Sequence, residues 1–188
     1  MSVIHISRSG KTYRLHVSKT STGKDKFFFS TKTEGVLAKK IPNGFEVYET
    51  VDSLVFLRRK TARIIQEDEF ALIQSFLDRI RGKSIFKAEI KKNMIVIHQA
   101  DESFGWAEML PPWIDAAKAE TLKAKFASYQ PVMRFVLEQK EKRLFRPERF
   151  CFRGSVDDWI VLGLPAPLKK LSAEFLKHLG KDSFYDLM

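Results

Sequence analysis

The residues best suited to chemistry gather in residues 146–159, RPERFCFRGSVDDW. This segment holds Glu148 and the adjacent pair Asp157 and Asp158, with several arginines around a Gly-Ser turn. Hard cations such as Mg²⁺ bind several oxygen ligands, and a bound Mg²⁺ supports phosphodiester hydrolysis. Successive side chains of an extended strand point to opposite faces, however, which separates Asp157 from Asp158. We therefore favour a structural interpretation, in which Ser155 or Asp157 caps a turn and the arginines pair with acids, over a metal-dependent hydrolase or nuclease.

His98 extends this alternative. It ends a predicted strand, three residues before Asp101 and Glu102. An imidazole beside carboxylates can hold a metal ion or exchange protons, so His98 joins the three carboxylates above as a candidate ligand. A histidine at the end of a strand is more often a simple surface group, and that is the interpretation we favour.

Other motifs of catalysis or cofactor binding are missing from the sequence. It contains no Walker A loop, no G-x-G-x-x-G loop and no G-x-S-x-G elbow. Cys151 is the single cysteine, and its neighbours Phe150 and Phe152 favour a buried structural thiol. One cysteine excludes an intramolecular disulfide and a thiolate zinc site, and it fits a reducing, cytoplasmic compartment. We predict no cofactor, and the sequence leaves open whether the protein is an enzyme.

Basic and aromatic residues are interleaved near the N-terminus. Sheets that bind single-stranded nucleic acid stack bases on exposed aromatic rings and hold phosphates with Lys and Arg. In residues 26–31, KFFFST, Phe27 and Phe29 share one face of a strand and leave Phe28 on the other as a stacking platform. The alternative is that all three rings are buried, and the pattern of an RNA-recognition motif is absent. The candidate nucleic-acid-binding residues are Lys24, Lys26, Phe28, Arg58, Arg59 and Lys60.

The net charge of +10 is concentrated in the same region. Residues 1–60 hold 12 Lys and Arg against 5 Asp and Glu, whereas residues 61–188 hold 21 against 18. A basic surface attracts polyanions such as nucleic acid, although lysine also serves solubility alone. If the first region binds nucleic acid, its basic side chains must converge on one exposed face.

Apolar periodicity predicts an α+β fold. Alternating residues at 12–17, 26–31, 45–50 and 53–59 predict a basic antiparallel β-meander over residues 1–60. Residues 61–188 then follow as helix–hairpin units and a C-terminal helix, packed with the meander as one compact unit. The predicted elements of this second region are a helix at 67–81, a hairpin at 85–90 and 94–99, a helix at 113–127, a hairpin at 132–139 and 142–152 that Pro147 breaks or bulges, and a helix at 168–179.

Two further features bear on partners. Trp106, in a proline-flanked loop at 101–112, and Trp113 directly after it suit an anchor for a protein partner. No run of about 18 apolar residues occurs, so we expect no membrane span and no membrane partner. The first residues also lack the apolar stretch of a secretory signal, which again favours the cytoplasm.

Four segments resemble a set of uncharacterised bacterial proteins. They are residues 22–30 (TGKDKFFFS), 41–49 (IPNGFEVYE), 55–59 (VFLRR) and 149–159 (RFCFRGSVDDW). The resemblance implies that most of the chain is one recurrent bacterial unit, and it transfers no catalytic residue. The function that the sequence favours is a non-enzymatic module that contacts nucleic acid through its N-terminal sheet, with the hydrolase and a protein-interaction subunit as alternatives.

Overall fold

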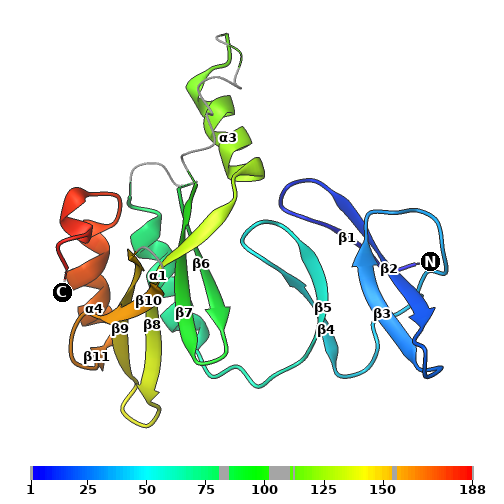
Figure 1. Cartoon of the computed structure of the whole chain (residues 1–188), viewed down its shortest axis with the longest axis horizontal. Coiled ribbons are helices and arrows are strands. Elements are labelled where there is room, and N and C mark those ends of the chain that lie inside the picture. Colours follow the sequence, from blue (N-terminus) through cyan, green and yellow to red (C-terminus); the bar gives the residue numbers. More distant parts are fainter. Residues whose placement is uncertain (1, 81–84, 102–110, 112, 154–155, 188) are drawn as a thin grey trace. The chain divides into compact units, whose positions relative to one another are not determined.

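The structure, a computed structural model, describes residues 2–80, 85–101, 111, 113–153 and 156–187. The chain divides into two compact units, Met1–Ala62 and Arg63–Met188, which we call unit 1 and unit 2. Strands are the main elements of both units (Figure 1).

Unit 1 contains two antiparallel sheets (Figure 1). One has the strand order β1-β2-β3, and the other is the hairpin β4-β5. The predicted single meander is therefore wrong, because β3 does not pair with β4. Gly35, between these strands, has a φ of +105°, and Leu37 forms an isolated bridge back to His16, so the chain returns to β2 instead of adding a strand. The bounds are β1 (Ile4–Ile6), β2 (Thr12–Lys19), β3 (Asp25–Ser30), β4 (Phe45–Glu49) and β5 (Val55–Arg59).

The inner faces of these two sheets form the core of unit 1. Leu15 of β2 and Val55 of β5 are buried there. Glu49 of β4 joins the sheets through polar contacts, since one carboxylate oxygen lies 3.0 Å from His5 Nε2 and the other accepts hydrogen bonds from the backbone N–H (2.8 Å) and Nε (3.0 Å) of Arg8. Burial raises the pKa of Glu49, but the hydrogen bonds from His5 and Arg8 outweigh burial and hold this pKa below its ordinary value.

Unit 2 is built on one antiparallel sheet with the strand order β10-β9-β8-β7-β6, and β11 also pairs with β9 (Figure 1). Its middle strand β8 (Tyr129–Gln139) pairs on both sides. The other strands are β6 (Phe86–Lys91), β7 (Met94–Ala100), β9 (Leu144–Arg153), β10 (Val156–Val161) and β11 (Ala166–Pro167).

Helices α1 (Glu67–Leu77) and α4 (Leu168–Phe175) pack on one face of this sheet. Helix α1 begins where the backbone N–H of Gln66 donates to Glu69 Oε2 at 2.8 Å, closing a capping box. Short 3₁₀ turns, η1 (Leu176–His178) and η2 (Asp182–Phe184), follow α4, and α3 (Ala116–Phe126) lies between β7 and β8. The core joins these helices to the sheet through fully buried side chains that include Ile73, Ile95, Ile97, Met133, Phe135, Phe145 and Leu176.

The predicted helix–hairpin units are wrong. Both hairpins exist, as β6–β7 and β8–β9, but β7 pairs with β8 across the intervening α3, so the two hairpins form one continuous sheet. Strand β10 is absent from the sequence prediction, which favours a turn capped by Ser155 or Asp157 at this place. Ile95, Val96 and Ile97 are buried in succession, and β7 is paired with a neighbouring strand on both of its edges.

Pro147 does not break its strand, contrary to the prediction. It is fully buried and pairs with Phe135, while β9 continues on either side. The Pro147 carbonyl accepts a hydrogen bond from Leu162 N at 3.0 Å, on the side where β10 has ended and β11 has not begun. The N–H that proline lacks would point to the same side, between the end of β10 and the start of β11, so the pairing of β9 with β8 does not depend on it.

Within the described residues, no helix combines the length and apolar character needed to span a bilayer.

Candidate nucleic-acid interface

The three-stranded sheet of unit 1 has an inner and an outward face. Leu15 is fully buried on the inner face. Cross-strand pairing places His16 opposite Phe28, and Arg14 opposite Ser30, on the outward face. This outward face is the candidate interface.

The three consecutive phenylalanines divide between these faces. Phe27 and Phe29 pair with Val17 and Leu15, and they are half-buried on the inner face. Phe28 is 39% exposed on the outward face. The alternative in which all three rings are buried does not hold.

Phe28 rests on a buried histidine. The rings of Phe28 and His16 are stacked, with centroids 5.5 Å apart and planes inclined by 16°. His16 is only 4% exposed, and its Nε2 lies 3.1 Å from the Lys32 carbonyl oxygen. Because a carbonyl can only accept, Nε2 carries the proton and donates this bond. Gly35 closes the other side, where an added Cβ would lie 3.3 Å from His16 Nδ1, so the imidazole is held in one orientation.

Two hollows adjoin along the outward face. The first, of about 520 Å³, lies beside the stacked rings, and the second, of about 670 Å³, lies beside Arg14. Ser30 lines both, so the two hollows adjoin at β3, and we refer to them together as the track. The first is lined by His16, Val17, Ser18, Phe28, Ser30, Lys32, Glu34, Gly35 and Val36, and the second by Lys11, Thr12, Tyr13, Arg14, Ser30 and Thr31.

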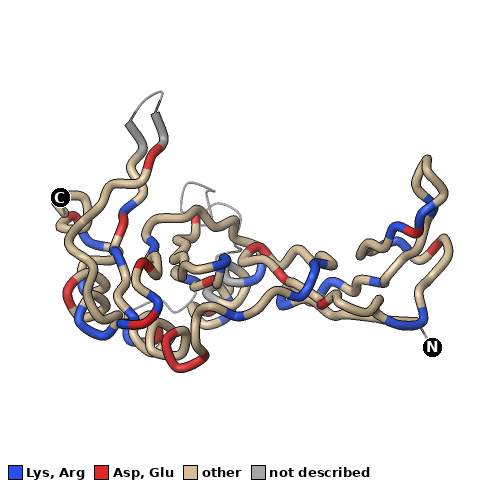
Figure 2. The backbone as a smooth tube through the Cα atoms, turned by 90° about the horizontal axis from the view of Figure 1, so that it is seen from below, with Lys and Arg blue, Asp and Glu red and all other residues tan. Residues whose placement is uncertain are grey.

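Several cations on or near this sheet face lack acidic partners among the described residues. Within the described part of the chain, Arg14, Lys26 and Lys32 form no ion pair, and the same is true of Lys24 in the β2–β3 turn. Glu34 is the single acid among the residues that line the two hollows. The charge excess of unit 1, visible in Figure 2, therefore includes unneutralised groups beside an exposed aromatic ring.

The other predicted basic residues belong to the second sheet of unit 1. Arg58 Nε donates to Glu46 Oε1 at 2.8 Å, and its guanidinium lies 4.2 Å from the Tyr48 ring centroid. Arg59 lies 6.0 Å from an aromatic centroid of β4, and Lys60 follows it, exposed. The structure therefore brings Lys26 and Phe28 together on one sheet and places Arg58, Arg59 and Lys60 on another.

Glu148, one of the carboxylates proposed as metal ligands, is already paired with two arginines. Glu148 is 3% exposed and accepts hydrogen bonds from Arg134 Nε at 2.5 Å and from Arg146 Nε at 2.8 Å. Arg134 in turn lies 4.1 Å from the Trp159 ring centroid. Two guanidinium groups compensate this buried charge, so Glu148 fits a structural ion pair better than a metal site.

The remaining hydrolase candidates do not converge on Glu148. Asp158 pairs with Cys151, three residues from Glu148 in β9, so Asp158 and Glu148 point to opposite faces of the sheet. His98 lies on β7, two strands from β9. Within the described residues no cluster of three potential ligands forms, and the side chain of Asp157 lies outside them.

His98 is not the surface group predicted from its position. It is 3% exposed inside β7, and its Nε2 lies 3.3 Å from Glu89 Oε2, which also lies 3.1 Å from Lys91 Nζ. Burial raises the pKa of Glu89, but the contacts of His98 and Lys91 outweigh burial and lower this pKa. The cluster joins β6 to β7.

Of the two tryptophans predicted to anchor a protein partner, the structure describes one. Trp113, in a turn before α3, is 83% exposed, whereas Trp106 lies outside the described residues. A docking role for these two tryptophans therefore stays a prediction.

No protein-family model matches the chain, and searches of curated proteins and of solved structures return no significant match. Sequence reasoning missed His16 and Arg14 as members of the candidate interface. The alternation in residues 12–17 placed Arg14 and His16 on a polar face, but only the strand register shows that Phe28 lies opposite His16.

Proposed function

We propose that unit 1 binds single-stranded nucleic acid along the outward face of β2 and β3, without catalysis. The observation that carries this proposal is the exposed Phe28 ring, backed by buried His16 and flanked by cations that have no acidic partner among the described residues. A base stacks on Phe28, while Lys26, Arg14 and Lys32 contact the phosphates on either side.

The chemistry favours a single strand over a duplex. An aromatic ring on a sheet can stack only on a base that has left its helix, and such stacking contributes about 1–3 kcal/mol per base. Lys and Arg contacts to phosphates release bound counterions, so affinity falls as salt rises. With three cations, log K against log salt should have a slope of about −2 for a single strand.

The test is fluorescence anisotropy of a labelled oligothymidine of about 12 nucleotides with the full chain, at about 50 and 200 mM salt. We expect Phe28→Ala to weaken binding by about 5- to 100-fold and Phe28→Trp to preserve it, because tryptophan also offers a stacking face. Phe56→Ala is the matched control, since Phe56 is 49% exposed on the other sheet of unit 1.

Three results would overturn the proposal. The first is equal loss in Phe28→Ala and Phe56→Ala, which would mean that the outward face of β2 and β3 has no special part. The second is an affinity that does not change between the two salt concentrations. The third is an unlabelled duplex that competes as well as the unlabelled single strand, which would show that stacking is not the mode of binding.

A further inference from the structure

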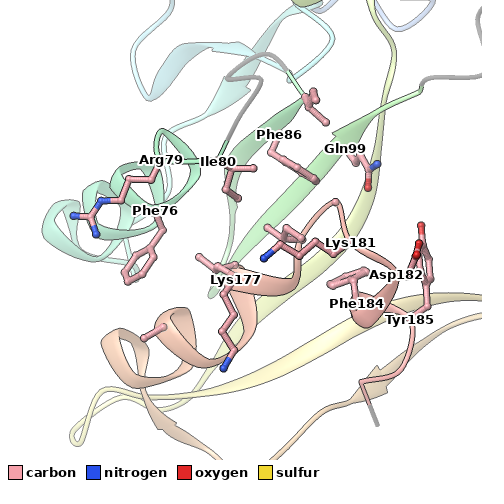
Figure 3. Close-up of a pocket in the computed structure, with 15 residues that line it drawn as sticks. Phe76, Arg79, Ile80, Phe86, Gln99, Lys177, Lys181, Asp182, Phe184 and Tyr185 are labelled. Atoms are coloured by element: carbon pink, nitrogen blue, oxygen red, sulfur yellow. The ribbon is translucent and has the colours of Figure 1, made fainter.

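Another hollow suited to a ligand lies in unit 2. It has a volume of about 680 Å³, within the range of about 300–1,000 Å³ typical of small-molecule sites. Helix α1 and the start of β6 form one part of its wall, and the segment after α4 forms the other (Figure 3).

The wall is largely apolar. Phe76 and Ile80 come from α1 and the turn that follows it, Phe86 comes from β6, and Leu176 and Phe184 come from the C-terminal segment. Phe86, Leu176 and Phe184 are themselves buried in the core of unit 2, so this part of the wall is rigid. Such a surface stabilises a ligand by removing its apolar atoms from water.

The rim carries an excess of positive charge. Arg79, Lys177 and Lys181 line the hollow, together with one acid, Asp182 (Figure 3). All four are exposed, and none forms an ion pair within the described part of the chain. The Arg79 guanidinium lies 5.5 Å from the Phe76 ring centroid, which sets a cation directly beside the apolar wall.

We propose that this hollow binds a small amphiphilic carboxylic acid. The aliphatic or aromatic body of the ligand lies against Phe86 and its apolar neighbours, and the carboxylate pairs with Lys181 at the rim, while Lys177 and Arg79 add longer-range attraction. A neutral apolar molecule gains the same burial but leaves the cations unused, whereas a small acid without an apolar body gains the charge contacts alone. The combination of wall and rim therefore selects both parts of the ligand.

The test is isothermal titration calorimetry of the full chain with octanoate, 1-octanol and acetate. We expect saturable 1:1 binding of octanoate, and binding weaker by about tenfold or more for 1-octanol and for acetate. The double substitution of Lys177→Glu and Lys181→Glu should weaken octanoate binding at least about tenfold. Its matched control is the double substitution of Lys169→Glu and Lys170→Glu, on exposed positions of α4 that do not line the hollow.

A second variant distinguishes loss of the binding site from loss of folding. Ala173 is exposed on α4 and lines the hollow, so Ala173→Trp should obstruct it and abolish octanoate binding while a thermal melt stays unchanged. The proposal fails if octanoate does not saturate, if 1-octanol binds as tightly as octanoate, or if both charge-reversal doubles weaken binding equally. It also fails if folded Ala173→Trp binds octanoate as the unaltered chain does.

Discussion

The two units use charged residues in different ways. In unit 2, buried acids are compensated: Glu148 lies between Arg134 and Arg146, and Glu69 is bound by Arg143. On the outward sheet face of unit 1, Arg14, Lys26 and Lys32 form no ion pair with any residue that the structure describes. Unit 1 also has 12 basic against 5 acidic residues, whereas unit 2 is nearly balanced at 21 against 18. The comparison shows that density of charge is a poor guide to a binding site, since the densest polar segment, 146–159, is structural in the part that the structure describes.

The largest effect is expected when Glu148, the acid between two arginines, is removed. Glu148→Ala leaves the guanidinium groups of Arg134 and Arg146 without their main partner. Both arginines are partly exposed, so we expect a loss of about 2–3 kcal/mol, below the range for a fully buried pair. Urea unfolding followed by tryptophan fluorescence measures it, because Trp106, Trp113 and Trp159 all belong to unit 2.

Glu138→Ala is the control for that substitution. Glu138 bonds the same arginine, Arg146, at 3.2 Å, but its side chain is 40% exposed, so the expected loss is under about 1 kcal/mol. If the two substitutions cost the same, the compensated pair is not what stabilises unit 2, and the contrast between the units fails.

A smaller effect is expected on lowering the pH. The pKa of Glu49 in the folded chain is depressed from its ordinary value of 4.5, so its contribution to the stability of unit 1 is fully present above that pH. The contribution declines as the pH falls from 4.5 through the folded pKa, because the unfolded chain then binds more protons. Glu49→Gln should lower the stability of unit 1 at neutral pH and flatten its loss in acid.

Amide hydrogen exchange read on peptides from residues 2–62 isolates this effect from unit 2. Glu34→Gln is the matched control, since Glu34 is an exposed carboxylate of the same unit, and it should leave the exchange profile unchanged. An acid response of Glu49→Gln identical to that of the unaltered chain would show that the contacts with His5 and Arg8 do not control the pH response.

The smallest expected effect sharpens the distinction between paired and unpaired cations within unit 1. Arg58 is engaged with Glu46 and Tyr48, so Arg58→Ala should change nucleic-acid affinity by less than about twofold. Lys26→Ala should weaken it by about three- to tenfold and make the salt slope shallower by about 0.7. Equal effects in the anisotropy assay would mean that affinity follows net charge and not the outward face of the sheet.

Local patterns predicted the individual elements well and their assembly poorly. The apolar stripe of residues 67–81 predicted α1, and the alternation in residues 12–17 predicted β2. Both predictions rest on the local periodicity of apolar residues alone. The pairing of β7 with β8 could not be predicted in this way, since the intervening 28 residues from 101 to 128 include a helix and separate the partners. A sequence pattern carries little information on such a long-range contact.

The candidate site shows the same limit. Phe28 could be assigned to the outward face from the two-residue period of a strand. His16, however, joins it only through the β2–β3 register, and Glu148 is neutralised by Arg134 from a different strand. Residue type indicated which groups were present, while cross-strand neighbours decided which of them were free.

The stacking of Phe28 on His16 has a thermodynamic consequence. The imidazole is fixed by its bond to the Lys32 carbonyl and by the nearby Gly35, so the phenyl ring above it has little rotational freedom to lose. Binding to a ring that is already ordered costs less conformational entropy than binding that must first order a mobile side chain. Removing the support through His16→Ala should therefore appear in calorimetry chiefly as a less favourable binding entropy, even though His16 is buried and need not touch the ligand.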